Sequence, residues 1–192
     1  YRSNPGSGVI PHNTFVLDNF IVTSYYRDGV TVADMTHPKL MIEVGNYDTS
    51  PLSGNGYNGA WGVYPYLPSG KILVSDIENG LFVLTFNGTK AAYIEGTVTD
   101  VAGSPIPGAT VNISGVGTAT TDFSGHYLLG TVTAGNYSAD YDASGYSTQT
   151  LATALTNGTT VVQNVVFGAV ASCSDGVMNG DETGVDLSLI HI

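Results

Sequence analysis

The chain has 192 residues, of which 42% are hydrophobic and 11% are charged, so it can bury one ordinary core or two small ones and is not expected to be disordered. Its formal net charge is −11 at pH 7, and it has no basic cluster that could neutralise phosphates or anionic lipid head groups. Nucleic acid and membrane surfaces are therefore excluded as partners, and no apolar run approaches the roughly 20 residues of a membrane-spanning helix.

Charge divides the chain into two parts. Residues 1–90 contain 5 Lys/Arg and 7 Asp/Glu, whereas residues 91–192 contain no Lys or Arg and 9 Asp/Glu. This break predicts two units with a boundary near Lys90.

Abundant Tyr and Gly with scarce Lys resemble the composition of exported bacterial surface proteins. The single Cys173 excludes a disulfide framework, and the start at Tyr1 predicts that the chain begins after a cleavage or inside a longer protein.

Short apolar runs alternate with turn signals through residues 1–90. Runs at residues 14–17, 20–24, 30–33 and 41–47 are separated by Asp18-Asn19, Asp28-Gly29 and His37-Pro38. Asp-Gly and Asn tolerate positive φ in tight turns and Pro cannot occupy a central ladder, so these runs predict four antiparallel strands. A second copy follows from Gly59 with GAWGVYPYLP, KILVSDI and GLFVLTF. Repeated four-strand units of about 40 residues are typical of β-propeller blades.

Three stretches carry a family resemblance. HNTFV, GVTVADMTHPKLMIEVGNYDT and YNGAWGVYPYLPSGKILVSDIENGLFVL resemble the last two blades of the LVIVD-repeat propellers of the choice-of-anchor B family. The resemblance implies an exported bacterial propeller with several further blades upstream. It also implies a last blade whose fourth strand comes from the far N-terminus. The second copy has only three strands before the next module, so we expect its sheet edge to be open.

Aromatic side chains in the second copy are candidates for ligand binding. Trp61 and the cluster Tyr64-Pro65-Tyr66 suit a sugar-stacking platform, and packing between blades is the alternative interpretation. His12 is a separate, weak candidate for a ligand-binding residue, because a side chain at the start of a blade would face the central channel of a propeller.

One pair of carboxylates is the candidate for catalysis. Asp76 and Glu78 flank Ile77, so on an extended strand they project from the same face, as a cation site or a glycosidase pair would use. A polar turn with solvated carboxylates is the alternative. No other motif for hydrolysis or zinc binding is present, so we expect no catalysis by this chain.

Residues 91–168 again alternate apolar and small polar residues between turns, which predicts a β-sandwich of about seven strands. The segment Thr121-Asp122-Phe123-Ser124-Gly125 places a side-chain acceptor at the start of a turn and a positive-φ residue at its end. His126 follows this turn without a second His or Cys nearby, so a surface or half-buried packing role is predicted rather than metal binding.

This second module resembles carboxypeptidase regulatory-like, or transthyretin-like, domains. The matching positions are Gly96, Val98, Asp100, Gly103, Pro105, Pro107, Gly108, Ala109 and Val111, then Thr121, Asp122, Gly125, Tyr127 and Leu129, and finally Ala134-Gly135-Asn136-Tyr137 and Gly145-Tyr146. The resemblance implies a structural spacer without catalytic residues. An isopeptide bond between Lys and Asn is excluded, because no Lys follows Lys90.

Residues 169–186 form an acidic, Cys-containing tail that resembles a motif preceding the sorting tails of exported bacterial proteins. Its oxygen donors have the composition of a Ca²⁺ loop, but their spacing departs from the EF-hand rule, and a solvated acidic linker is the favoured interpretation. These donors are Asp175, Asn179, Asp181, Glu182 and Asp186. From Leu187 to Ile192 the sequence LSLIHI resembles translated sequencing-adapter DNA, so we expect this hexamer to be an artefact.

The sequence as a whole predicts an all-β protein, with the last two blades of a β-propeller at residues 1–90 followed by a small transthyretin-like β-sandwich at residues 91–168. We expect a non-enzymatic secreted or cell-surface protein whose propeller binds a carbohydrate or protein ligand or acts as a scaffold. The sandwich would be a spacer before a truncated anchoring region, and no cofactor other than Ca²⁺ is expected. The alternative is a fragment of a secreted hydrolase whose catalytic residues lie upstream.

Overall fold

The computed structural model describes residues 8–168, and the regular structure in this range consists of β-strands. The prediction of an all-β chain is confirmed there, and the range contains no helix that could cross a membrane. The tail predictions, namely Cys173, the proposed Ca²⁺ ligands and the hexamer, lie outside the described residues. The ligands concerned are Asp175, Asn179, Asp181, Glu182 and Asp186.

The described chain divides into two compact units. The first unit contains the residues up to Tyr93 together with Gly130–Gly135 and Leu155–Thr160. The second unit contains Ile94–Leu129, Asn136–Ala154 and the chain from Val161 onward. Each unit is described separately below.

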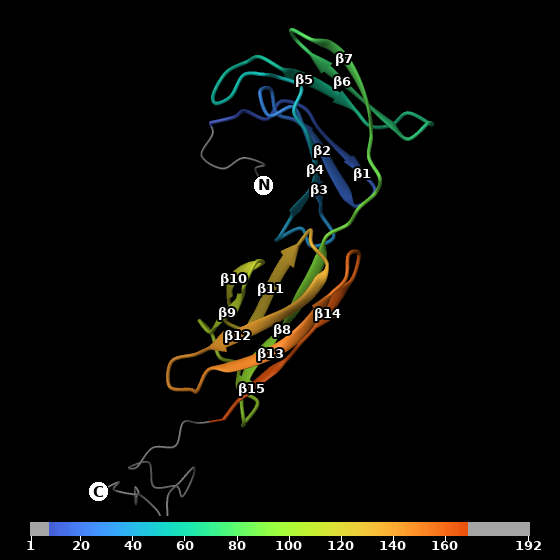
Figure 1. Ribbon diagram of the computed structural model, residues 1–192. Coiled ribbons are helices and arrows are strands. Elements are labelled where there is room, and N and C mark those ends of the chain that lie inside the picture. The colour runs from blue at the N-terminus through green and yellow to red at the C-terminus, as the bar shows by residue number, and fades with distance from the viewer. Residues whose placement is uncertain (1–7, 169–192) are drawn as a thin grey trace, which may run out of the picture. The chain divides into compact units, whose positions relative to one another are not determined.

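A four-stranded antiparallel sheet opens the first unit, with its strands side by side in chain order (Figure 1). Its strands are β1 (Thr14–Leu17), β2 (Phe20–Ser24), β3 (Val30–Asp34) and β4 (Ile42–Tyr47). All four predicted strands are confirmed to within a residue at each end. The predicted turns are confirmed as well, because Asp18 and Gly29 both have positive φ, at 52° and 73°.

The second sheet of this unit has the order β5-β6-β7, from β5 (Ala60–Tyr64), β6 (Lys71–Asp76) and β7 (Gly80–Thr85). The three predicted strands of the second copy are therefore confirmed. Among the described residues no strand pairs with the outer edge of β7, whereas the corresponding edge of β3 pairs with β4.

The two sheets pack face to face and share one apolar core. Its buried members are Phe20, Val22, Val30, Val32, Ala60, Val63, Ile72 and Val74. Phe82, Leu84 and Phe86 pack against this core from the second sheet and its continuation. Burial of such side chains removes apolar surface from water and is the main source of stability for the unit.

The two sheets pack together through different faces of equivalent hairpins. The β2–β3 hairpin pairs Ser24 with Val30, and the β6–β7 hairpin pairs Ser75 with Leu81 across a turn of the same length. By this equivalence, Val30 and Val32 of the first sheet correspond to Leu81 and Val83 of the second. Val30 and Val32 are buried between the sheets, whereas Leu81 and Val83 are 65% and 58% exposed.

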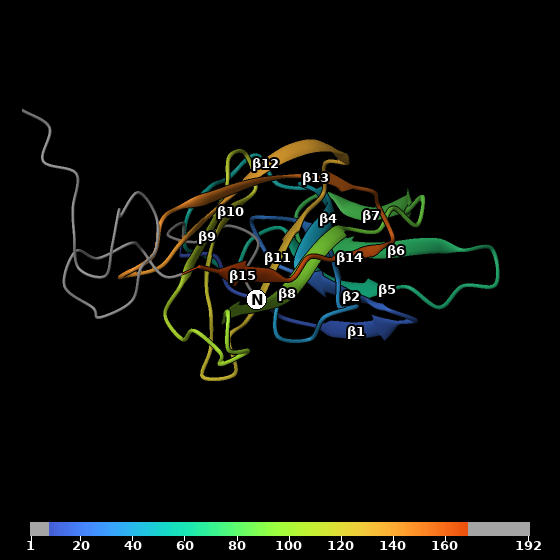
Figure 2. The same cartoon turned by 90° about the horizontal axis from the view of Figure 1, so that it is seen from below.

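The sandwich is built from two sheets. One has the order β10-β9-β12-β13, and in the other β8 lies between β11 and β14 and also pairs in parallel with β15 (Figures 1 and 2). The strands are β8 (Ala92–Asp100), β9 (Thr110–Ile113), β10 (Gly117–Thr120), β11 (His126–Thr131), β12 (Gly135–Asp142), β13 (Gln149–Leu155), β14 (Thr160–Val162) and β15 (Val165–Phe167). The predicted sandwich is thus confirmed with eight strands in place of about seven.

A pair of tyrosines occupies the centre of the sandwich. The hydroxyls of Tyr127 and Tyr141 lie 2.9 Å apart, and the Tyr127 hydroxyl donates to the Gln163 carbonyl at 2.7 Å. Burial raises the pKa of both phenols above the ordinary value. A Cβ at Gly96 would lie 2.1 Å from the same carbonyl, so only glycine permits this approach of the Gln163 backbone to β8.

Candidate functional site

His12 lies on the segment that precedes β1 and is fixed there by its backbone, which donates to the Ser24 carbonyl at 2.8 Å. Its Nε2 accepts a hydrogen bond from the indole Nε1 of Trp61 at 2.8 Å. An indole N–H can only donate, so Nε2 is the acceptor in this hydrogen bond, and Nδ1 faces the Asn13 side-chain oxygen. Both imidazole nitrogens of His12 therefore have partners.

Trp61 owes its orientation to a β-bulge. Ala60 pairs with Asp76 and Gly62 pairs with Ser75, which leaves Trp61 as the extra residue between two regular pairs of β5 and β6. A bulge of this kind bends the strand and changes the direction of a side chain. The carbonyl of Trp61 accepts from the Ser24 hydroxyl at 3.1 Å, and the side chain is 54% exposed.

Four rings follow one another beside this bulge and form what we call the aromatic row: Trp61, His12, Tyr26 and Tyr57. Successive ring centroids lie 5.5, 5.4 and 5.4 Å apart. Tyr26 is buried and is held by a two-way backbone bridge with Ala60, at 2.9 and 2.8 Å. Tyr57 is 70% exposed, so the row presents its two largest exposed rings at its two ends.

Three polar side chains adjoin the aromatic row and are called the polar rim: Arg27, Asn58 and Glu78. Arg27 donates to the Asn58 side-chain oxygen through Nε at 3.2 Å and Nη2 at 2.6 Å, and to the Ser53 carbonyl at 2.9 Å. Glu78 accepts from Asn58 Nδ2 at 2.6 Å and from the Gly59 amide at 2.8 Å. These two donors, Asn58 first, hold the pKa of Glu78 below its ordinary value, so the carboxylate is ionised near neutral pH.

The predicted pair of Asp76 and Glu78 on one strand face is wrong. Strand β6 ends at Asp76, which is buried and accepts from the amides of Glu78 and Asn79 at 2.9 and 2.7 Å. Burial raises the pKa of Asp76, but the polar groups around it, with Thr49 first among them, hold the pKa below its ordinary value. Because Asp76 accepts from the amides of the following turn, the extended conformation ends there. Glu78 therefore lies in that turn, and its carboxylate accepts from Asn58.

The aromatic cluster at Tyr64 and Tyr66 is engaged elsewhere. The Tyr66 hydroxyl donates to the Val16 carbonyl at 2.7 Å, and its ring packs edge-on against Phe15 and Tyr64. Sequence reasoning grouped these residues with Trp61 and treated His12 separately. The structure instead pairs His12 with Trp61 and adds Tyr26 and Tyr57. The sequence signal for these two tyrosines was weak, since Tyr57 lies between Gly and Asn and Tyr26 only precedes the Asp28-Gly29 turn.

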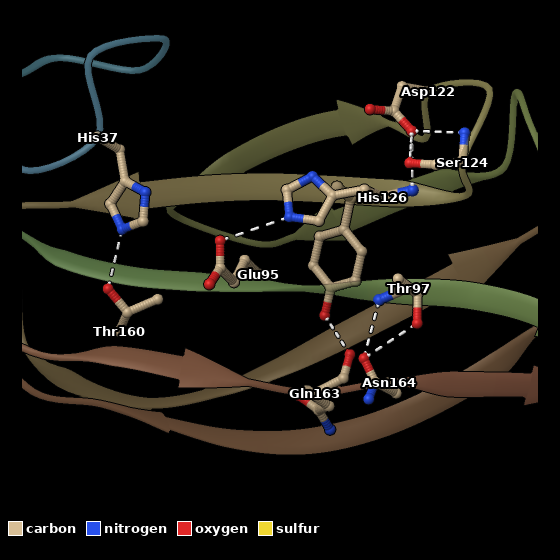
Figure 3. A network of polar contacts seen from close by, with 10 residues as sticks. His37, Glu95, Thr97, Asp122, Ser124, His126, Thr160, Gln163 and Asn164 are labelled. Carbon is tan, nitrogen blue, oxygen red and sulfur yellow. Dashed lines mark hydrogen bonds and ion pairs between the residues drawn. The ribbon is translucent and has the colours of Figure 1, made fainter.

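Polar side chains of the sandwich serve its own turns and strands (Figure 3). Asp122 accepts from the Ser124 amide and hydroxyl at 2.8 and 2.6 Å and from the His126 amide at 3.0 Å. The predicted turn is thereby confirmed, with φ of 74° at Gly125. His126 is half-exposed and lies 3.4 Å from the Glu95 carboxylate, as predicted for a surface role. Within residues 8–168 no three His, Cys, Asp or Glu side chains gather as a metal site would require.

Comparison with protein families assigns the sandwich. Residues 93–168 match the family model of the carboxypeptidase regulatory-like domain, so the chain contains such a domain. This match does not extend to residues 1–90, and the propeller blades there stay a prediction. No curated protein sequence matches the chain.

Three solved structures illustrate the structural similarities of the chain. The minor pilin GBS52 of Streptococcus agalactiae is 14% identical, with a TM-score of 0.38 over 69% of this chain and 70% of that chain. A streptococcal ancillary pilin is 15% identical, with a TM-score of 0.39 over 73% and 50%. Chlorocatechol 1,2-dioxygenase from Pseudomonas putida is 14% identical, with a TM-score of 0.31 over 45% and 62%.

Proposed function

We propose that this chain is part of a non-enzymatic bacterial protein that is secreted or displayed on the cell surface. Residues 1–90 are the last blades of a propeller and carry the binding surface, and the sandwich at residues 91–168 is a spacer between that surface and an anchoring region.

The carboxypeptidase regulatory-like sandwich is the observation that carries the proposal. Its polar side chains are used to build the domain itself. Asp100 accepts from the amides of Ala102 and Ser104 at 2.9 and 2.8 Å, and the Asn164 side chain accepts from the Thr97 amide and hydroxyl at 2.9 and 3.2 Å (Figure 3). Groups engaged in this way stabilise turns and strand ends, as a rigid spacer needs.

Features of the first unit support a binding role. The repeated hairpins with equivalent registers favour blades, and the exposed rings of Trp61 and Tyr57 favour a contact surface. Asp76 accepts from the backbone amides of its own turn, and Glu78 accepts from the Gly59 amide of another segment, so both carboxylates that could have formed a catalytic pair are engaged.

Two measurements test the proposal. Antibodies against the chain should label intact, unpermeabilised cells of the encoding organism or its culture medium. The purified chain should show no turnover on panels of peptides, esters and polysaccharides. Labelling that requires permeabilisation would contradict the location, and turnover abolished by Asp76→Asn or Glu78→Gln would contradict the non-enzymatic role.

A further inference from the structure

We propose that the aromatic row and the polar rim together form a carbohydrate-binding site that takes an uncharged oligosaccharide. The inference rests on the proposed binding role of the first unit and names the ligand class and the residues that recognise it. Trp61 and Tyr57 supply the stacking surfaces, His12 positions Trp61, and Asn58 and Glu78 supply polar contacts.

The exposed rings provide apolar surfaces of the size of a sugar ring. The C–H face of a pyranose packs on the flat face of an indole or phenol, and these two side chains remain 54% and 70% exposed. Trp61 cannot rotate freely, because its indole N–H is bound to His12 and its backbone lies in the bulge. A ring that is already oriented loses little conformational freedom when a ligand binds.

The polar rim supplies hydrogen-bonding groups of the kind that sugar hydroxyls require. Each carboxylate oxygen of Glu78 receives one protein hydrogen bond and can accept another. Asn58 follows Tyr57 directly in sequence, and its side chain is held between Arg27 and Glu78. A few fixed polar groups beside an apolar surface are the usual composition of a small-ligand site.

Other ligands that stack on aromatic rings fit less well. Nucleic acid bases stack in the same way, but they bring phosphates that a chain of net charge −11 repels. Quaternary ammonium groups require ring faces arranged around them as a cage. Here successive ring centroids lie only 5.4 to 5.5 Å apart, so the rings contact one another directly and leave no room for a cation between them.

The length of the aromatic row indicates an oligosaccharide rather than a single sugar. Three steps of 5.4 to 5.5 Å between ring centroids separate Trp61 from Tyr57, and the rings between them are the exposed His12 and the buried Tyr26. A ligand that contacts both end rings would also pass the exposed His12, so we expect it to be longer than one sugar unit.

Trp61 is the only tryptophan of the chain, so its fluorescence reports on the site directly. The full chain is titrated with neutral oligosaccharides from a glycan panel, with their monosaccharides and with choline, and each affinity is confirmed by calorimetry. We expect an oligosaccharide to change the Trp61 emission and to bind more tightly than its monosaccharide. Tyr57→Ala and Trp61→Ala should each weaken binding by about tenfold or more.

Phe123→Ala is the matched control, because Phe123 is 94% exposed and belongs to the second unit. It should leave the affinity unchanged. Circular dichroism establishes that each variant is folded, and Tyr57→Ala removes a side chain too exposed to be needed for folding. The proposal is overturned if no saccharide binds, if choline binds in place of sugars, or if both row variants bind as the wild type does. Any of these results leaves the surface location and the absence of turnover, which are measured separately, unaffected.

Discussion

The imidazole of His12 is held on both sides, since Nε2 accepts from the indole of Trp61 and Nδ1 faces the side-chain oxygen of Asn13. This arrangement connects the segment before β1 to the bulge in β5. Two residues that are 49 positions apart in the chain therefore fix one another, and neither can be assigned its role from local sequence alone.

Replacing His12 by Leu should change the surroundings of Trp61 while leaving the fold intact. The indole N–H loses its acceptor but remains partly exposed to water, so we expect the free energy of unfolding to fall by less than about 1 kcal/mol. The emission of Trp61 in the ligand-free chain should shift to longer wavelength as the indole gains solvent. His126→Leu is the control and should leave the emission unchanged; a shift of equal size in both variants would contradict the assigned contact.

Asp122 should make the sandwich sensitive to acid. The Ser124 hydroxyl, followed by the amides of His126 and Ser124, lowers the pKa of Asp122 from an ordinary value of 3.8. A lowered pKa in the folded state means that this carboxylate stabilises the fold fully above pH 3.8 and less as pH falls through its folded pKa.

We therefore expect Asp122→Asn to destabilise the chain by a constant amount near neutral pH. The difference in melting temperature from the wild type should shrink below about pH 4. Melting curves recorded across the acidic range test this expectation, and Ser124→Ala should show the same trend, because it removes the strongest donor. A difference that grows on acidification would contradict the assignment.

At the scale of elements, the equivalent hairpins of the two sheets contain two valines at matching positions, one buried and one exposed. Val32 of β3 is buried between the sheets, and its counterpart Val83 of β7 is exposed. The two valines have the same side chain and the same place in their hairpins. They differ in whether another sheet covers them.

Val32→Ala should therefore lower the free energy of unfolding by about 2 kcal/mol, from the loss of buried methyl groups and the cavity that remains. Val83→Ala should change it by no more than about 0.5 kcal/mol. Urea titrations of the two variants measure both values. Equal losses would show that the exposed face of the second sheet is covered in this chain.

The strands of the first unit could be predicted because their signals are local. Apolar runs bounded by turn residues define the strands other than β5 to within a residue at each end, whereas the run predicted for β5 continues to Pro68 and the strand ends at Tyr64. The candidate site could not be predicted in the same way. Its rings come from three segments that are far apart in the sequence and are joined by contacts such as the Tyr26–Ala60 bridge and the hydrogen bond from Trp61 to His12. The pairing of Asp76 with Glu78 failed because alternation holds only within a strand, and β6 ends at Asp76.

For the whole molecule, the sandwich should fold without the first ninety residues. Its buried core is supplied by strands β8 to β15, with Val98, Val111, Tyr127, Tyr141 and Phe167 at its centre. Some of its residues, Gly130–Gly135 and Leu155–Thr160, group with the first unit and would lose contacts when that unit is removed.

A fragment of residues 91–168 should accordingly melt in one cooperative transition, at a lower temperature than the same domain in the full chain. Circular dichroism and the dispersion of amide resonances measure this. A fragment that has no cooperative transition would show that the division near Lys90 does not separate independent folding units.

The exposed face at Leu81 and Val83 also limits which symmetry a contact with a neighbouring sheet can have. The contact between the two sheets is heterologous, because it joins different faces of equivalent hairpins. Repeating a heterologous contact produces a ring when the rotation closes and a helical array when it does not, and it does not produce a two-fold pair. A neighbour that continued this contact would therefore present a surface similar to the opposite face of the second sheet, which is built from Ile72, Val74, Phe82 and Leu84. Its surface would differ from the face at Leu81 and Val83 that it covers.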